Sequence, residues 1–224
     1  MNIKRVAYGV LGCLAFFVMA SAARAGTITL TFEGLQDTEP IDNYYNGGLG
    51  GFGSGPGPNY GITFSSNSLA IISDLDGGSG NFTNNPSGDT VMFFLSGPGD
   101  VMNLAAGFTT GFSFFYSGNS AVGDGSVDVY SGLNGTGTLL ASFSVNTSLT
   151  PLCSSGPSYC VWQPDGVSFS GTAESVVFGG AANYIAWDNI TLGSSTPTGV
   201  TPEPASLILL GTGLLGLALV RRSL

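Results

Sequence analysis

The chain has 224 residues and a formal net charge of −9, and its five basic residues all lie near the two ends. Residues 26–200 therefore contain no Lys, Arg or His, yet they hold thirteen of the 14 carboxylates, all except Glu203. This distribution argues against nucleic-acid binding, because affinity for phosphate depends on Lys and Arg, and it disfavours binding to anionic lipid headgroups.

Carboxylates that cluster in such a domain can be neutralised only by protonation, by backbone N–H groups or by a metal cation. Calcium prefers hard oxygen ligands and is the natural candidate for a structural ion. The alternative is that the charges are spread over a solvated surface and maintain solubility. Composition alone leaves both open.

The N-terminus has the three parts of a secretory signal peptide. A basic start is followed by an apolar run over residues 6–20 and by a box of small residues that ends at Ala25. This order predicts cleavage by signal peptidase before Gly26, so that residues 1–25 are removed. The alternatives are an uncleaved transmembrane helix and a lipoprotein signal at Cys13.

Residues 26–192 have the pattern of a single all-β domain. Short β-branched and aromatic runs alternate with Gly, Asn, Ser and Asp, and no stretch keeps a 3.6-residue apolar period. Period-two alternation is typical of antiparallel sheets with one buried face. We therefore expect a jelly-roll-like antiparallel β-sandwich, with strands at residues 27–33, 62–65, 69–73, 90–95, 111–116, 126–131, 138–145, 167–170, 175–178 and 184–192.

A long glycine-rich loop spans residues 34–60 and carries Tyr44 and Tyr45. It has no phosphate-loop spacing with a Lys, which argues against nucleotide binding. Aromatic rings stack on sugar faces, so the two tyrosines are candidates for a sugar-contact surface. The alternative is a surface loop whose tyrosines pack down onto the domain.

Cys153 and Cys160 are the only cysteines outside the predicted signal peptide. In an oxidising compartment such a pair is expected to form a disulfide. A redox pair or a metal site would need closer spacing or further ligands. We therefore predict a structural disulfide, which stabilises the fold by about 2–3 kcal/mol through the unfolded state.

Residues 193–200 follow the last predicted strand and consist of small polar residues with one proline. Such a segment has too little apolar surface to fold, so its composition predicts a flexible linker between the domain and the C-terminal tail.

The tail, residues 201–224, has three parts in a fixed order. They are Pro202, Glu203 and Pro204, then an apolar run over residues 205–220, then Arg221 and Arg222. As a helix the run would be about 24 Å long, and arginines that snorkel to the interface help so short a helix to cross a membrane. The positive-inside rule places the arginines in the cytoplasm and the domain outside. A helix buried in a globule is the alternative.

The tripartite tail resembles the PEP-CTERM sorting signal. In proteins with this signal an exosortase, a membrane-embedded cysteine transpeptidase-like enzyme, recognises the tail. The resemblance implies an inner-membrane anchor that is transient, processing near the Pro-Glu-Pro motif, and transfer to the cell surface or extracellular matrix. It also implies a Gram-negative host that makes exopolysaccharide. It covers the tail alone and leaves the activity of the domain open.

The domain itself more distantly resembles sugar-binding jelly-roll modules, through residues 31–34 and 186–190. In such modules the first and last strands lie side by side, and a Glu and an Asp often share a structural calcium. The resemblance implies Glu33 and Asp188 as ligands, with backbone carbonyls completing the oxygen shell. Asp42 is a further candidate without motif support. The alternative is that Asp188 and its neighbour only form hydrogen bonds at a strand end.

This domain lacks the side chains that most catalytic mechanisms need. Without His, Lys or Arg, triad, cysteine–histidine and phosphoryl-transfer chemistries have no base or clamp. A two-carboxylate glycoside hydrolase stays chemically possible, but no spacing nominates a pair. We therefore expect no catalytic residues and a non-catalytic surface or matrix protein. The alternative is a calcium-dependent module that binds carbohydrate, such as exopolysaccharide.

Overall fold

The computed structural model describes residues 26–199. The predicted signal peptide, residues 1–25, and the predicted transmembrane run, residues 205–220, lie outside this part of the chain, as do the sorting residues around them.

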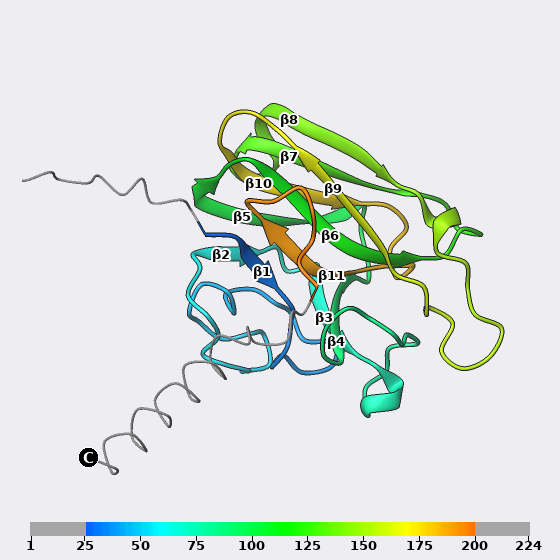
Figure 1. The fold of residues 1–224 in the computed structure, drawn as a ribbon. Helices are drawn as coiled ribbons and strands as arrows, with labels where there is room; N and C mark the ends of the chain where they lie inside the picture. Colours follow the sequence, from blue (N-terminus) through cyan, green and yellow to red (C-terminus); the bar gives the residue numbers. More distant parts are fainter. Residues whose placement is uncertain (1–25, 200–224) are drawn as a thin grey trace, which may run out of the picture.

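Eleven strands and three short 3-10 turns make up residues 26–199 (Figure 1). The strands are β1 (Ile28–Leu30), β2 (Ile62–Phe64), β3 (Ser68–Ile72), β4 (Thr90–Phe94), β5 (Gly99–Phe108), β6 (Gly111–Gly118), β7 (Gly125–Gly132), β8 (Thr136–Val145), β9 (Gln163–Ser168), β10 (Ala173–Gly179) and β11 (Ile185–Leu192). The turns are η1 (Asp74–Asp76), η2 (Leu133–Gly135) and η3 (Thr147–Leu149).

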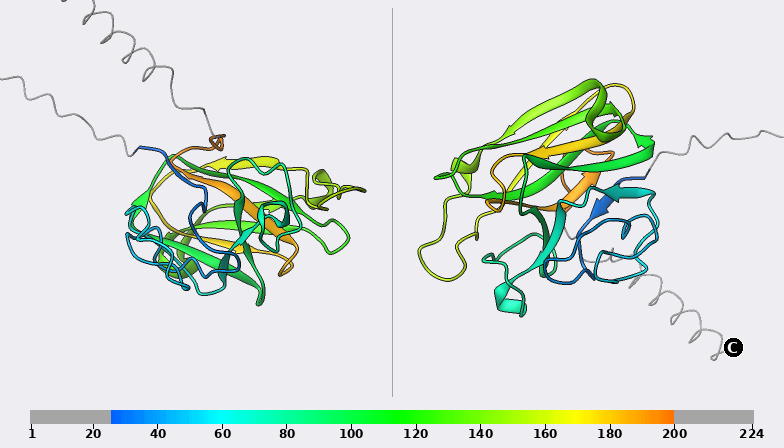
Figure 2. Two further views of the ribbon diagram at one scale, coloured as in Figure 1. Left: turned by 90° about the horizontal axis from the view of Figure 1, so that it is seen from below. Right: turned by 180° about the vertical axis from the view of Figure 1, so that it is seen from behind.

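The strands form two antiparallel sheets that pack face to face (Figure 2). One sheet has the order β3-β4-β11-β6-β9, with β1 also paired to β11, and the other has the order β2-β5-β10-β7-β8. The predicted all-β antiparallel sandwich is confirmed. The expected adjacency of the first and last strands is also present, since Ile28 pairs with Leu192.

The core between the sheets is built mainly from aromatic side chains. Trp187 of β11 is fully buried, with its ring stacked on Phe94 at 5.7 Å and edge-on to Phe178 of the opposite sheet at 5.4 Å. Phe178 in turn packs against Phe112 and Phe114 of β6. Aromatic side chains bury more apolar area than any others, so this cluster provides much of the force that holds the two sheets together.

Strand β5 was not predicted from the sequence, although it lies between β2 and β10 in its sheet. Two features hide it. Its inward-facing positions begin with a charged residue, Asp100, and its second half contains two alanines and a glycine. A charged residue at an inward position breaks the apolar alternation from which a half-buried strand is identified.

Asp100 is buried beside Phe178, its register partner on β10, and is 1% exposed. Neither carboxyl oxygen has a hydrogen-bond partner among residues 26–199, and the same holds for Nε1 of Trp187. Burial raises the pKa of Asp100 to about 8, because a charged carboxylate is poorly solvated in the core. The side chain is therefore held in its neutral form at neutral pH.

Replacing Asp100 should change how stability depends on pH. The folded pKa is about 8 and the model-peptide value is 3.8, so the unfolded chain loses its proton first. The Asp100 carboxyl alone therefore lowers the unfolding free energy by about 1.4 kcal/mol for each pH unit between these two values. Asp100→Asn should remove that slope, raising stability at pH 8.5 and leaving it little changed at pH 4, as measured by urea unfolding.

The matched control is Asp128→Asn, a substitution at an outward-facing position of β7. It should keep the wild-type pH profile. If Asp100→Asn shows the same pH dependence as the wild type, Asp100 is ionised in the folded protein and this account of the core is wrong.

Candidate functional site

The carboxylates singled out from the sequence lie beside an interruption in strand β11. On one edge β11 pairs with β4 at Ala186 and Trp187, and then with β1 from Ile190 onward. Residues 188 and 189 face the gap between those two partners. Here a bulge shifts the register with β6, and Asn189 takes a left-handed backbone conformation with φ 48°. Bulges commonly redirect side chains beside functional sites.

A single loop after η1 donates hydrogen bonds to both carboxylates, and Asp188 also accepts the Asn189 N–H at 2.7 Å. Asp188 accepts bonds from the backbone N–H of Ser87 at 2.9 Å and from its hydroxyl at 3.0 and 3.1 Å. Glu33 Oε1 accepts from the N–H groups of Asp89 and Thr90, both at 3.2 Å. A Cβ atom at Gly88, between these donors, would collide with the Glu33 carboxyl. The structure thus brings Glu33 and Asp188 to one loop, as expected.

Burial raises the pKa of Glu33 to about 7. Burial likewise raises the pKa of Asp188 to about 7, and the nearby charge of Glu33 adds to the effect, while hydrogen bonds from Asn189 and Ser87 oppose it. Both carboxyls bond to one loop, and burial drives both toward the neutral form in a domain without a cationic side chain.

Tyr44 and Tyr45 do not form a sugar-contact surface, because both are buried, at 8% and 3% exposure. Their hydroxyls instead hold the segment that carries Glu33. Tyr44 donates to the Glu33 carbonyl at 2.9 Å, and Tyr45 accepts the Phe32 N–H at 2.6 Å. Phe32 has φ 64°, which is costly for a bulky residue, so these bonds help to fix a sharp turn before Glu33.

Asp42 does not join the pair. Residues 26–199 contain no group of three or more His, Cys, Asp or Glu side chains placed to hold one metal ion. Any cation at Glu33 and Asp188 would therefore need backbone carbonyls or water to complete its shell.

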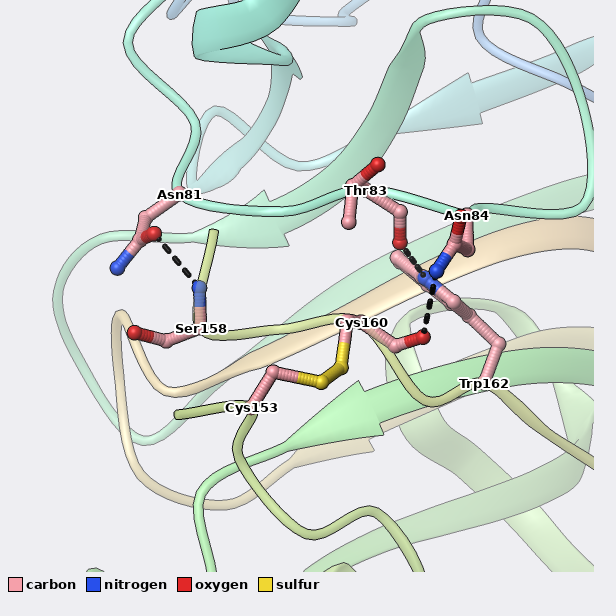
Figure 3. Close-up of a disulfide and its surroundings, with 7 residues drawn as sticks. All are labelled: Asn81, Thr83, Asn84, Cys153, Ser158, Cys160 and Trp162. Carbon is pink, nitrogen blue, oxygen red and sulfur yellow. Dashed lines mark hydrogen bonds between the residues drawn. A yellow bond between two sulfur atoms is a disulfide. The ribbon is translucent and has the colours of Figure 1, made fainter. Parts of the chain in front are cut away.

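The predicted disulfide between Cys153 and Cys160 is present, with Cα atoms 6.1 Å apart. It closes a loop that docks onto residues 79–84 (Figure 3). Asn81 Oδ1 accepts from the N–H of Ser158 at 2.8 Å, and Trp162 Nε1 donates to the carbonyl of Thr83 at 3.0 Å. The disulfide therefore stabilises one wall of a pocket.

This pocket, the tyrosine pocket, has a volume of about 270 Å³ and lies on the outer face of the sheet that contains β3, β4 and β11. Phe82 and Phe93 are buried in its base, at 3% and 5% exposure, and Tyr184 is 40% exposed at its mouth. Tyr159, Asn81 and Asn183 also line the pocket. No charged residue lines it.

A second pocket, of about 520 Å³, lies between residues 26–28 and the turn that joins β5 to β6. Its walls are Gly, Thr and aliphatic residues with one phenylalanine, and they include no amide or charged side chain. It offers fewer directional contacts than the tyrosine pocket.

Glu39 is an important residue that the sequence did not reveal. It is fully buried, and its carboxylate accepts three backbone N–H groups, from Gln36 at 2.7 Å, Phe52 at 2.8 Å and Ser54 at 3.0 Å. Burial acts to raise its pKa, but these hydrogen bonds outweigh burial and lower it. A Cβ atom at Gly50 would lie 2.5 Å from Oε1. Glu39 thus organises the 34–60 loop, and nothing in the sequence distinguishes it from Asp37 and Asp42 of the same loop.

The family described as the PEP-CTERM protein-sorting motif matches residues 200–222. The chain carries a PEP-CTERM sorting motif. Such a motif implies an exported protein that is sorted by an exosortase. None of the helical segments in residues 26–199 is long and apolar enough to span a membrane. No curated protein matches the chain.

Several solved structures are similar to the chain in part. A cleaved adhesin domain of Lys-gingipain is 15% identical with a TM-score of 0.45, over 75% of this chain and 98% of that chain. A family 6 carbohydrate-binding module is 18% identical with a TM-score of 0.37, over 59% and 87%. The catalytic domain of a GH87 α-1,3-glucanase is 14% identical with a TM-score of 0.37, over 67% of this chain and 31% of that one. Similarity at this level says nothing about ligand or activity.

Proposed function

We propose that this chain is an exported, non-catalytic protein of the cell surface or extracellular matrix. The observation that carries the proposal is the sorting motif at residues 200–222. In this account signal peptidase removes residues 1–25, the run at 205–220 anchors the chain in the inner membrane, and an exosortase processes the tail. The acidic domain then reaches the surface of a Gram-negative cell.

The described site residues support a non-catalytic role. The tyrosine pocket and the pocket beside residues 26–28 are not lined by any Asp or Glu. Glycoside hydrolysis needs two carboxyls on opposite sides of the scissile bond. Glu33 and Asp188 instead both accept backbone N–H groups of one loop.

The sorting proposal predicts that the Pro-Glu-Pro residues and the arginines are required for processing. Glu203→Ala and the double variant Arg221→Ala/Arg222→Ala should accumulate as membrane-bound precursor in a host that contains an exosortase. The expected measurement is loss of the smaller, surface-exposed product on an immunoblot of fractionated cells. The control Glu174→Gln changes one carboxylate on β10 and should be processed normally. Normal processing of both Glu203→Ala and the double arginine variant would remove the proposal.

A second candidate function is recognition of a neutral carbohydrate in the tyrosine pocket. Tyr159 and Tyr184 supply aromatic faces, and Asn81 and Asn183 supply amide donors and acceptors at the same opening. Pockets that recognise small ligands combine mostly apolar walls with a few directional polar groups. Because no charged residue lines the pocket, a neutral sugar suits it better than a uronic acid or a sulfated sugar.

The disulfide also supports this site. Tyr159 lies directly before Cys160. Its N–H donates to the Asn81 carbonyl at 3.1 Å, and its carbonyl accepts from the Thr83 N–H at 2.9 Å. One tyrosine of the pocket is therefore held in place before any ligand arrives, which lowers the entropy cost of binding.

Substitution at the pocket should weaken glycan binding without unfolding the domain. Tyr184→Ala should weaken binding to any neutral glycan found on an array by at least about tenfold, equivalent to roughly 1.4 kcal/mol. Tyr159→Ala should act similarly, measured by calorimetry on the best glycan. Tyr60→Ala, which removes a tyrosine that is 42% exposed and outside the pocket, is the matched control. An array that stays negative for folded protein would exclude this second function.

We also propose a structural calcium ion at Glu33 and Asp188. The pair fits a cation because both carboxyls are driven toward the neutral form at one loop, in a domain without cationic side chains. Glu33 and Asp188 would supply two oxygen ligands, and backbone carbonyls would supply others. The ion would tie the turn after β1 to the bulge of β11.

Calcium should raise the melting temperature, and the rise should depend on pH. Without calcium, the pKa values of about 7 mean that stability from these carboxyls is lost as pH rises through 7. Calcium binds the ionised form, so thermal unfolding at pH 8 should shift upward with calcium concentration, and less so at pH 5. The double variant Glu33→Gln/Asp188→Asn should not respond. Equal melting temperatures in calcium and in chelator at pH 8 would exclude the ion.

A further inference from the structure

The segment after β11, residues 193–198, lies against the sheet although its composition predicts a flexible linker (Figure 1, orange). We call this segment the strap. Its first half is held by β6, because the Gly193 N–H donates to the Gly111 carbonyl at 2.9 Å and the Ser113 hydroxyl donates to the Ser194 carbonyl at 2.9 Å.

The far end of the strap is fixed at Thr198, whose hydroxyl lies 3.4 Å from Thr191 Oγ1 in addition to three closer contacts. Asn189 Nδ2 donates to the Thr198 carbonyl at 2.9 Å, and the Thr198 N–H donates to Thr191 Oγ1 at 3.3 Å. The hydroxyls of Thr198 and Thr29 are 2.5 Å apart. Asn189 Oδ1 lies 2.6 Å from the Ser87 hydroxyl, which shares its single proton between Asn189 and Asp188, so Asn189 links the strap to the loop that holds the carboxylate pair.

Two glycines on neighbouring strands leave room for the strap. A Cβ atom at Gly111 of β6 would lie 2.6 Å from the Ser195 nitrogen, and one at Gly166 of β9 would collide with the Ser195 carbonyl. Neither glycine has a positive φ, so a side chain would fit their backbone conformations. Gly111 is crowded chiefly by the strap, and Gly166 also by Ser113.

The docked strap limits how far the sorting motif can lie from the domain. Only three residues separate Thr198 from Pro202. At about 3.6 Å per residue, the motif can then lie no farther than about 14 Å from Thr198, whereas release of the strap back to Gly193 would allow about 32 Å. A domain of this length has a radius of gyration of about 16 Å. With the strap docked, the motif therefore stays within one domain radius of the fold.

We propose that the strap controls processing of the tail: the exosortase gains access to the Pro-Glu-Pro motif only when residues 193–198 detach from the sheet. This inference rests on the proposed sorting function. A membrane-embedded enzyme must reach a motif between the bilayer and the domain, and the docked strap leaves little space between them.

Detachment needs little free energy. The strap is anchored by a few hydrogen bonds, each with a net contribution of about 0.5–1.5 kcal/mol, and Ser195, Thr196 and Thr198 are exposed. It contributes no large apolar side chain to the core. Segments with these properties open locally without unfolding the domain.

The test compares locked and released straps in the full-length chain, expressed in an exosortase-containing host. In the locked variant, Thr29→Cys/Thr198→Cys, a disulfide replaces the close contact of the two hydroxyls. We expect the locked precursor to accumulate in membranes. Adding a reductant to isolated membranes should restore processing. This recovery would show that the locked precursor is folded. Thr198→Cys alone and reductant-treated wild type are the controls.

The released variant is Gly111→Ala, which should be processed faster than the wild type. Gly199→Ala is the matched control, since a Cβ atom there meets nothing within 4 Å. Processing of the disulfide-bonded locked variant at the wild-type rate would overturn the inference, as would an unchanged rate for Gly111→Ala. If the wild type itself is not processed, the sorting proposal fails instead.

Discussion

In a domain without Lys, Arg or His, backbone N–H groups are the main donors that can hold a carboxylate, and the loops are arranged to provide them. Glu39 accepts three such groups across the 34–60 loop. Asp37 accepts two, from residues 72 and 79, and thereby ties that loop to the segment around η1. Asp124 accepts the Thr147 N–H and hydroxyl and joins the turns before β7 and after β8. Hydrogen bonds to a charged group are among the stronger ones, so these acids fix loops that have few apolar residues.

Most strands were predictable because their apolar alternation or β-branched runs are visible in the sequence, as in β7 and β8. The alternation fails at β5, where Asp100 occupies an inward position. The predicted end of β1 lies beyond its observed end, because nothing in a run of Thr, Phe and Glu reveals that the chain turns at Phe32, which has φ 64°. The bulge at Asn189 was equally hidden, although Trp187 and Ile190 are both inward-facing and three residues apart.

The candidate site was predictable only where two short motifs define it. Glu33 and Asp188 were expected together through their resemblance to other modules, and they do share one loop. Tyr44 and Tyr45 show the limit of such reasoning. In a glycine-rich sequence, no pattern distinguishes an exposed tyrosine from a buried one. The tyrosine pocket draws its lining from residues 71–93, from Tyr159 and from residues 183–186. Their convergence depends on the disulfide loop docking onto residues 79–84, which spacing along the chain cannot reveal.

Strand β11 is both the strand that leads into the tail and the third of five strands along the main path of its sheet. It is hydrogen-bonded to β6 along most of its length and to β4 and β1 on its other edge. A pull on the tail therefore acts along β11, and the antiparallel bonds on both sides resist it together rather than one after another. If the tail attaches the protein to a cell surface as proposed, drag from flowing water would enter the fold through a strand that is hydrogen-bonded on both edges. An attachment at an edge strand such as β9 would peel away bond by bond.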